Sequence, residues 1–314
     1  MPEAPHLVER AILKTLLYAD IFDFPLTPRE VHHRLIECRA SGAAVEARLQ
    51  ALQAGGEVER VNGYVAVAGR SELFEIRHER GARSAALWPH ARHWGARLAA
   101  LPFVRMVAVT GALAVDNVAG RSDIDFLLVT TPGRLWLCRA LAVSLVRAAA
   151  TRGVLLCPNY LVTTRRLHFD EHNLFTAHDL VQMVPLYGAK TYQALWEQNR
   201  WWEPFLPQAN EPLKPRALVQ LSPRMKRLKQ WGEQMLAGQT GTRLEGWEQR
   251  RKARKLRQQQ LDSQRPSRDH LAFDSDVCKG HFDGHAQRTL QAYQARLRRH
   301  GLALDKEEEH AHRH

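Results

Sequence analysis

The sequence contains few cysteines and no apolar run long enough to cross a membrane. The four cysteines are scattered along the chain: Cys38, Cys138, Cys157 and Cys278. Their spacing shows no paired framework, so we expect reduced thiols and a cytoplasmic location. The longest apolar run, residues 135–150, is interrupted by Arg139 and Arg147. It predicts a buried or amphipathic helix and no membrane partner.

Acidic residues are also under-represented. The chain has 33 Asp and Glu against 45 Lys and Arg, which gives a net charge of +12. Residues 213–300 hold 20 Lys and Arg against 8 Asp and Glu, an excess equal to that of the whole chain. Such a surface attracts polyanions without selecting among them. Because 45% of the residues are hydrophobic, we expect a folded protein rather than a disordered one.

The first 70 residues predict three helices followed by a hairpin. Residues 7–19 and 43–54 have helical spacing of apolar positions, and Thr27-Pro28-Arg29-Glu30 forms a capping box with proline at the first helical position. Asn62-Gly63 lies between two strand-like segments and is a strong hairpin signal. Residues 1–70 therefore resemble a winged-helix domain.

Such a domain binds DNA or serves as a docking module. The candidate recognition helix, residues 43–54, offers only Glu46, Arg48 and Gln50 as long polar side chains. These side chains are a poor set for phosphate and base contacts, which favours docking. Both roles stay open.

The middle of the chain predicts an α/β (α+β) fold with a mixed sheet. Residues 71–100 predict a helical connector that breaks at Pro89. Residues 101–210 form the predicted core. Within it, the predicted elements follow in the order strand 104–110, strand 123–130, helix 134–150 and strand 154–164, with helical structure from about residue 175.

The remainder of the chain predicts a helical basic region over residues 211–305 and a frayed tail over residues 306–314. Within it, residues 243–260 are almost free of apolar side chains and predict a surface helix. The run Arg250 to Arg257 predicts contact with a nucleic-acid backbone or a solvated helix face.

Residues 107–129 contain the chemistry-bearing motif. A strand-like run ends in Gly111-Ala112, and Ser122 then precedes Asp123-Ile124-Asp125 at the start of another strand. A strand that ends in glycine before a helix presents free backbone N–H groups to a phosphate. Aspartates at i and i+2 on a strand point to one face and hold a hard cation such as Mg²⁺.

This segment resembles the motif of the DNA polymerase beta-like nucleotidyltransferase superfamily. The resemblance implies a nucleotidyltransferase core that uses Mg²⁺ and an NTP donor to transfer a nucleoside monophosphate to an acceptor. It also implies that Asp123 and Asp125 are catalytic metal ligands and that Gly111, Ala112 and Ser122 bind the nucleotide.

Two departures from the family pattern weaken the expectation of catalysis. Ala112 stands where the family has Ser or Gly, and residues 159–164 contain no third carboxylate. Asn159 or Thr163 would face the site instead, or Asp170 or Glu171 would reach it. The alternative is a catalytically degenerate nucleotide- or DNA-binding regulatory protein on the same fold.

Two other patterns suggest metal ligands. His168 and His172 match the spacing of inverted zinc peptidases, which requires both histidines on one helix face, but the surrounding sequence has no sustained helical pattern. Cys278, His281 and His285 have ligand-like spacing but no obvious fourth ligand. We expect exposed loop histidines in the first case and a turn in the second.

Overall fold

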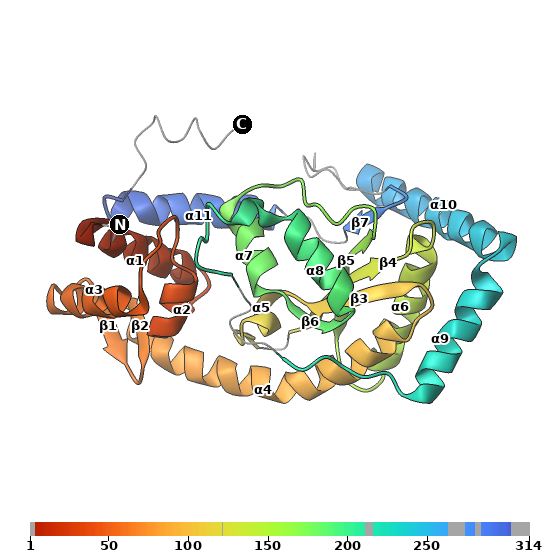
Figure 1. The fold of residues 1–314 in the computed structure, drawn as a ribbon, viewed down its shortest axis with the longest axis horizontal. Coiled ribbons are helices and arrows are strands. Elements are labelled where there is room, and N and C mark those ends of the chain that lie inside the picture. Colours follow the sequence, from red (N-terminus) through yellow and green to blue (C-terminus); the bar gives the residue numbers. More distant parts are fainter. Residues whose placement is uncertain (1–3, 121, 211–215, 263–273, 280–283, 303–314) are drawn as a thin grey trace.

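The computed structural model describes residues 4–120, 122–210, 216–262, 274–279 and 284–302. It is a mixed α/β structure with a five-stranded mixed sheet and a separate two-stranded antiparallel sheet. Figure 1 shows the two-stranded sheet among the N-terminal helices and the larger sheet further along the molecule. In the part of the chain that the structure describes, no helix is both long and apolar enough to cross a bilayer.

The N-terminal unit has the predicted order of three helices and a hairpin. Thr27 caps the second helix, and its capping box with Glu30 is complete. Asn62 and Gly63 both have positive φ angles, 51° and 82°, as a tight hairpin turn requires. The elements are α1 (Pro5–Asp20), α2 (Pro28–His33), α3 (Gly42–Ala54), β1 (Val58–Val61) and β2 (Tyr64–Val67).

One long helix, α4 (Glu72–Ala99), links this unit to the larger sheet and runs along the molecule (Figure 1). The predicted break at Pro89 is wrong, because the helix continues through it. The buried faces of Trp88, Ala91 and Trp94 pack in the core beneath the sheet on both sides of the proline. This packing outweighs the single backbone hydrogen bond that a proline removes.

The larger sheet has the strand order β6-β3-β4-β5-β7. Only the β4–β5 pair is parallel, and α6 provides the crossover between these two strands. The strands are β3 (Val104–Val109), β4 (Ile124–Thr130), β5 (Leu156–Thr163), β6 (Val184–Tyr187) and β7 (Val277–Lys279). The intervening helices are α5 (Gly111–Ala114), α6 (Leu135–Ala150), α7 (Leu174–Gln182) and α8 (Ala189–Gln198), followed by the 3₁₀ turn η1 (Arg200–Trp202).

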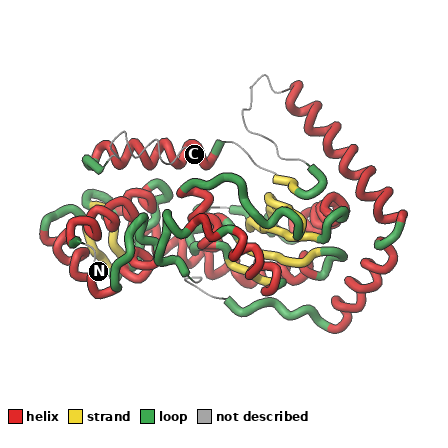
Figure 2. The backbone as a smooth tube through the Cα atoms, turned by 45° about the horizontal axis from the view of Figure 1, so that its top comes forward, coloured by secondary structure: helices red, strands yellow, loops and turns green. Residues whose placement is uncertain are grey.

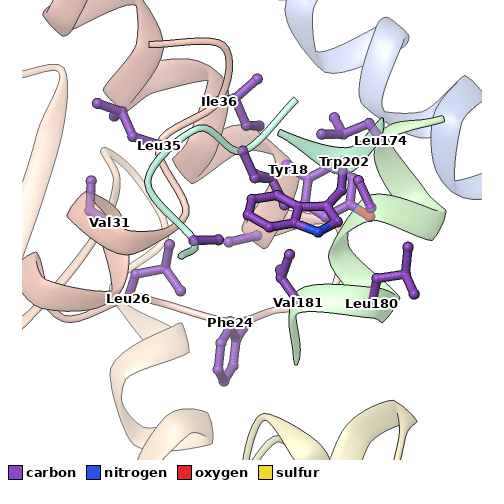
Figure 3. Packing of buried hydrophobic residues seen from close by; sticks show 14 of the residues in the cluster. Tyr18, Phe24, Leu26, Val31, Leu35, Ile36, Leu174, Leu180, Val181 and Trp202 are labelled. Atoms are coloured by element: carbon purple, nitrogen blue, oxygen red, sulfur yellow. The ribbon is translucent and has the colours of Figure 1, made fainter. Parts of the chain in front are cut away.

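Alternate residues of the central strands point to opposite faces of the sheet and pack in two different hydrophobic cores. Phe126 and Leu128 face α4 and α6, whereas Leu127 and Val129 belong to a core that also contains residues of α7, α8 and η1. The second core continues into the N-terminal helices, where Tyr18 packs close to residues of α7 (Figure 3). The N-terminal unit and one face of the sheet therefore share a single hydrophobic core.

The described part of the basic region contains the helices α9 (Pro223–Leu236), α10 (Gln239–Asp262) and α11 (His285–Arg299). Figures 1 and 2 place α9 and α10 on the side of the molecule away from α1–α3, and α11 beside α1. Glu245 of α10 accepts hydrogen bonds from the first N–H groups of α6, at Trp136 and Leu137. This carboxylate caps α6 from another part of the chain.

Sequence patterns missed two strands. β6 lies in a stretch that the sequence predicts as helical, and β7 lies within the predicted helical basic region. Both are short edge strands, and β6 contains Pro185. Their pairing partners come from distant parts of the chain, so local periodicity gave no signal for them.

A substitution at Gly188 tests how closely β6 packs against β3. Its φ is +84°, and a Cβ atom there would lie 2.0 Å from the backbone oxygen of Arg105. We expect Gly188→Ala to lower the free energy of unfolding by at least about 3 kcal/mol, because backbone strain and a backbone clash add together. The matched control is Gly69→Ala, which has a φ of +80° but no atom within 4 Å of the added carbon. Urea unfolding of both variants measures the difference, and equal losses would contradict the packing.

Candidate metal and nucleotide site

The site lies at the turn between β3 and the short helix α5, beside the start of β4. Gly111 begins α5 with a φ of +64°, and a Cβ atom there would lie 2.5 Å from Oδ2 of Asp125. The backbone N–H of Thr110 donates to the backbone oxygen of Asp125, at 3.1 Å. Glycine is therefore needed at residue 111 both for its backbone angle and for the room that the carboxylate occupies.

The loop between α5 and β4 is fastened to its surroundings by buried and half-buried polar groups. Asn117 donates from its side chain to the backbone oxygen of Phe22 and accepts from Arg80 of α4. Trp88 of α4 donates its indole N–H to Asp116, at 2.8 Å. The loop before Asp123 is thus held by both α4 and the N-terminal unit.

Asp123 and Asp125 lie two residues apart, as the sequence predicts. Asp123 is exposed just before β4, while Asp125 is half-buried on the strand. Alternation places Asp125 on the same sheet face as Leu127 and Val129, which is the face that α7 and α8 cover. The carboxylates form a compact group with Cys157, in which one ligand atom of each residue lies within 4.8 Å of the others.

Residues of β5 complete the site. Cys157 pairs directly with Asp125 in the parallel β4–β5 ladder, and the register then shifts before Leu127 and Tyr160. This irregularity gives β5 one extra residue, and Asn159 donates its amide N–H to Oδ1 of Asp125, at 2.9 Å. Bulges often re-aim a side chain in this way beside functional sites.

The pKa of Asp125 is raised to about 7. The largest cause is burial, followed by the negative charges of Asp123 and of Asp179 on α7. Burial and the two aspartates likewise raise the pKa of the Cys157 thiol to about 12. A hydrogen bond between Asp125 and the Cys157 thiol opposes these effects and lowers the pKa of Asp125. The site therefore has a local excess of negative charge in a strongly basic protein.

The structure separates the residues that the sequence proposed as third ligands. Asn159 faces Asp125, but Thr163 donates its hydroxyl to Asp276. Asp170 pairs with Arg166, and Glu171 pairs with Lys279. Of the predicted nucleotide-binding residues, Gly111 and half-buried Ala112 lie at the start of α5, and Ser122 directs its hydroxyl to the backbone oxygen of Asp123.

Cys157 is the member of the group that the sequence did not indicate. It has no motif of its own, and its place depends on the parallel register between two strands separated by α6. All four cysteines lie in the described residues, and none of them forms a disulfide there.

The structure does not place the residues of the two alternative metal-ligand patterns in the arrangement that each pattern requires. His168 and His172 lie in a loop rather than on a helix, although their Nε2 atoms are 3.1 Å apart. Cys278 is buried on β7, and His285 contacts Thr289 at 3.0 Å. His281 lies outside the described residues. Among those residues, the only group of three or more possible metal ligands is that of Asp123, Asp125 and Cys157.

The candidate recognition helix α3 directs its long polar side chains to the protein itself. Arg48 pairs with Glu9 at 3.3 Å, and Glu46 pairs with Arg60 at 2.7 Å. Gln50 donates to Glu46. These contacts fit a docking role better than contact with DNA phosphates.

No protein-family model matches this chain, and comparisons with curated proteins and with solved structures find no match. The expectation of a nucleotidyltransferase therefore depends on the motif and on the geometry of its residues.

The raised pKa of Asp125 gives a pH-dependent prediction. The folded-state pKa of about 7 exceeds the ordinary value of 3.8 for an aspartate. The carboxyl group therefore destabilises the fold increasingly as pH rises between these two values. Asp125→Asn keeps an acceptor for Asn159 but cannot ionise. We compare the free energies of unfolding of the variant and the wild type in the absence of metal. We expect their difference to shift in favour of the variant by on the order of 2 kcal/mol between pH 4.5 and pH 8.

Urea unfolding in the presence of a chelator at both pH values measures this gain. Asp170→Asn is the control, since Asp170 lies exposed in a surface pair with Arg166. A gain that does not change with pH, or that is equal in the control, would contradict the raised pKa.

Proposed function

We propose that the protein is a Mg²⁺-dependent nucleotidyltransferase, which transfers a nucleoside monophosphate from an NTP to an acceptor. The observation that carries the proposal is the placement of Asp123 and Asp125 beside the Gly111 turn. There, the carboxylate of Asp125 occupies the room left by the missing glycine side chain. Two carboxylates beside a strand-to-helix turn are suited to hold a metal and a triphosphate together.

Asp123 and Asp125 fit the oxygen donors that Mg²⁺ prefers. When bound, the metal would supply charge stabilisation for the transferring phosphoryl group and lower the pKa of an attacking hydroxyl. Asp125 would enter the reaction ionised, because a cation opposes the charge repulsion from Asp123. The Asn159 amide holds one carboxylate oxygen of Asp125 and so orients the other.

Removing the aspartates tests the activity directly. With labelled NTPs, Mg²⁺ and cell extract as a source of acceptor, we expect wild-type protein to transfer label. Asp123→Ala and Asp125→Ala should each lower the rate by at least about 100-fold, the scale of losing one group that stabilises the transition state. Asp170→Ala removes an acid away from this site and should keep the wild-type rate. Tight NTP binding with no aspartate-dependent transfer would favour the degenerate binding protein instead.

Asn159 offers a gain-of-function test. Asn159→Asp would place a third carboxylate beside Asp125, in exchange for the amide that now donates to it. We expect Mg²⁺ affinity, measured by calorimetry, to rise about tenfold because the number of charged ligands tunes affinity. Without metal, the variant should lose stability through charge repulsion.

The matched control is Asn173→Asp, because Asn173 caps α7 and aspartate is an equally good cap. A Mg²⁺ affinity that stays unchanged in Asn159→Asp would show that residue 159 does not face the metal.

Nucleic acid is the acceptor class that the charge distribution favours. Exposed charged side chains on α9 and α10 include Arg224, Arg227 and Arg243, whereas the acids Glu245 and Glu248 are buried. Exposed aromatic rings lie on the same helices, with Trp231 60% and Trp247 55% exposed. Basic side chains with exposed aromatic rings are typical of single-strand binding surfaces.

A cytoplasmic location stays a prediction from the cysteine pattern.

A further inference from the structure

The thiol of Cys157 changes the chemistry that the two aspartates offer. Cys157 lies directly opposite Asp125 in the β4–β5 ladder, so the two side chains share one face of the sheet. The ligand atoms of Asp123, Asp125 and Cys157 all lie within 4.8 Å of one another. Mg²⁺ prefers an all-oxygen shell, whereas a thiolate selects a softer ion such as Zn²⁺.

The charges at the site fit the binding of a cation. The carboxylates of Asp123 and Asp125 lie within 4.8 Å of each other. The polar partners of Asp125 on β5 are neutral groups, the amide of Asn159 and the thiol of Cys157. Elsewhere in the described residues, half-buried or buried acids such as Glu30 and Asp20 pair with arginines. A divalent cation would supply here the charge that arginines supply at those positions.

We propose that Asp123, Asp125 and Cys157 bind a thiophilic divalent cation of the Zn²⁺ class, which excludes Mg²⁺ from the same carboxylates and so inhibits the reaction. Zn²⁺ takes both carboxylate oxygen and cysteine sulfur, and three protein ligands leave a fourth position for water. Binding releases the thiol proton to solvent as the metal–sulfur bond forms. The inhibition rests on the proposed function, but the binding does not.

The geometry requires only a small closure. Around a tetrahedral Zn²⁺ ion with bonds of about 2.0–2.3 Å, neighbouring ligand atoms lie roughly 3.5 Å apart. The present separations are no more than 4.8 Å, so the ligand atoms need to approach one another by at most about 1.3 Å. Asp123 is exposed just before the start of β4, so its side chain has room to rotate toward the other two.

Cobalt gives a spectroscopic test, because Co²⁺ occupies zinc sites and a thiolate ligand adds a near-ultraviolet charge-transfer band. We expect the band when Co²⁺ is added to chelator-treated full-length protein, and its loss when Zn²⁺ displaces Co²⁺. Cys157→Ala should abolish the band and weaken Zn²⁺ binding by at least about tenfold. Metal held by the tail histidines, His310, His312 and His314, would have no thiolate ligand and would not give this band.

Cys278→Ala is the matched control, because Cys278 belongs to the competing Cys-x2-His-x3-His pattern. It should keep the band, and circular dichroism confirms that each variant is folded. The proposal is overturned if wild-type protein shows no thiolate band, or if the band persists in Cys157→Ala.

The transfer assay separates this inference from the proposed function. In excess Mg²⁺, we expect Zn²⁺ to lower the wild-type rate, and we expect the ratio of rates with and without Zn²⁺ to stay nearer to one in Cys157→Ala. A thiolate band without any nucleotidyl transfer would refute the proposed function and the inhibition but keep the metal site. Transfer with Mg²⁺ but without a band or Zn²⁺ inhibition would refute the metal site and keep the proposed function.

Discussion

The carboxylate of Asp125 occupies the space that a side chain at residue 111 would need. A Cβ atom on Gly111 would lie 2.5 Å from Oδ2 of Asp125, so the β3–α5 turn and the start of β4 approach each other as closely as glycine allows. This contact places backbone groups of the turn beside the two aspartates. The nucleotide-binding and metal-binding parts of the proposed site both depend on it.

The surrounding fold makes this approach rigid. The β3–β4 pair is antiparallel and lies in the middle of the sheet, with β6 on one side and β5 on the other. Helix α4 and the N-terminal unit hold the loop before Asp123 through Trp88, Arg80 and Asn117. The core beneath the Asp125 face continues into α1–α3 (Figure 3). We interpret the N-terminal unit as a structural support of the site, which agrees with the paired polar side chains of α3.

Local chemistry made much of the fold predictable from the sequence. A few adjacent residues are enough to predict the capping box at Thr27, the Asn62-Gly63 turn and the strands on both sides of Asp123. The structure contains all of these features. The mixed α/β class followed from the same patterns. The helix break at Pro89 failed because tertiary packing of α4 determines the helix there, and local propensity does not.

The site was only partly predictable for a similar reason. Gly111, Asp123 and Asp125 form a motif that is visible in one stretch of sequence. The sequence left Asn159 and Thr163 as alternatives, and the irregularity in β5 decides for Asn159. The contribution of Cys157 depends on the parallel register across α6, which only three-dimensional pairing reveals. The edge strands β6 and β7 were missed because their partners are distant in the chain. Thus the sequence indicated two oxygen ligands and a candidate amide, and the fold selects the amide and adds a thiol.

The central claim is that Asp123 and Asp125 bind a metal together with a nucleotide. The most direct test is a crystal structure of the full chain with Mn²⁺, a substitute for Mg²⁺, and a non-hydrolysable NTP analogue, in which anomalous scattering locates the metal. The account predicts a metal peak bonded to both carboxylates, with the triphosphate against the Gly111 turn. A metal peak elsewhere, or a nucleotide bound away from Gly111 with no metal at the aspartates, would contradict it.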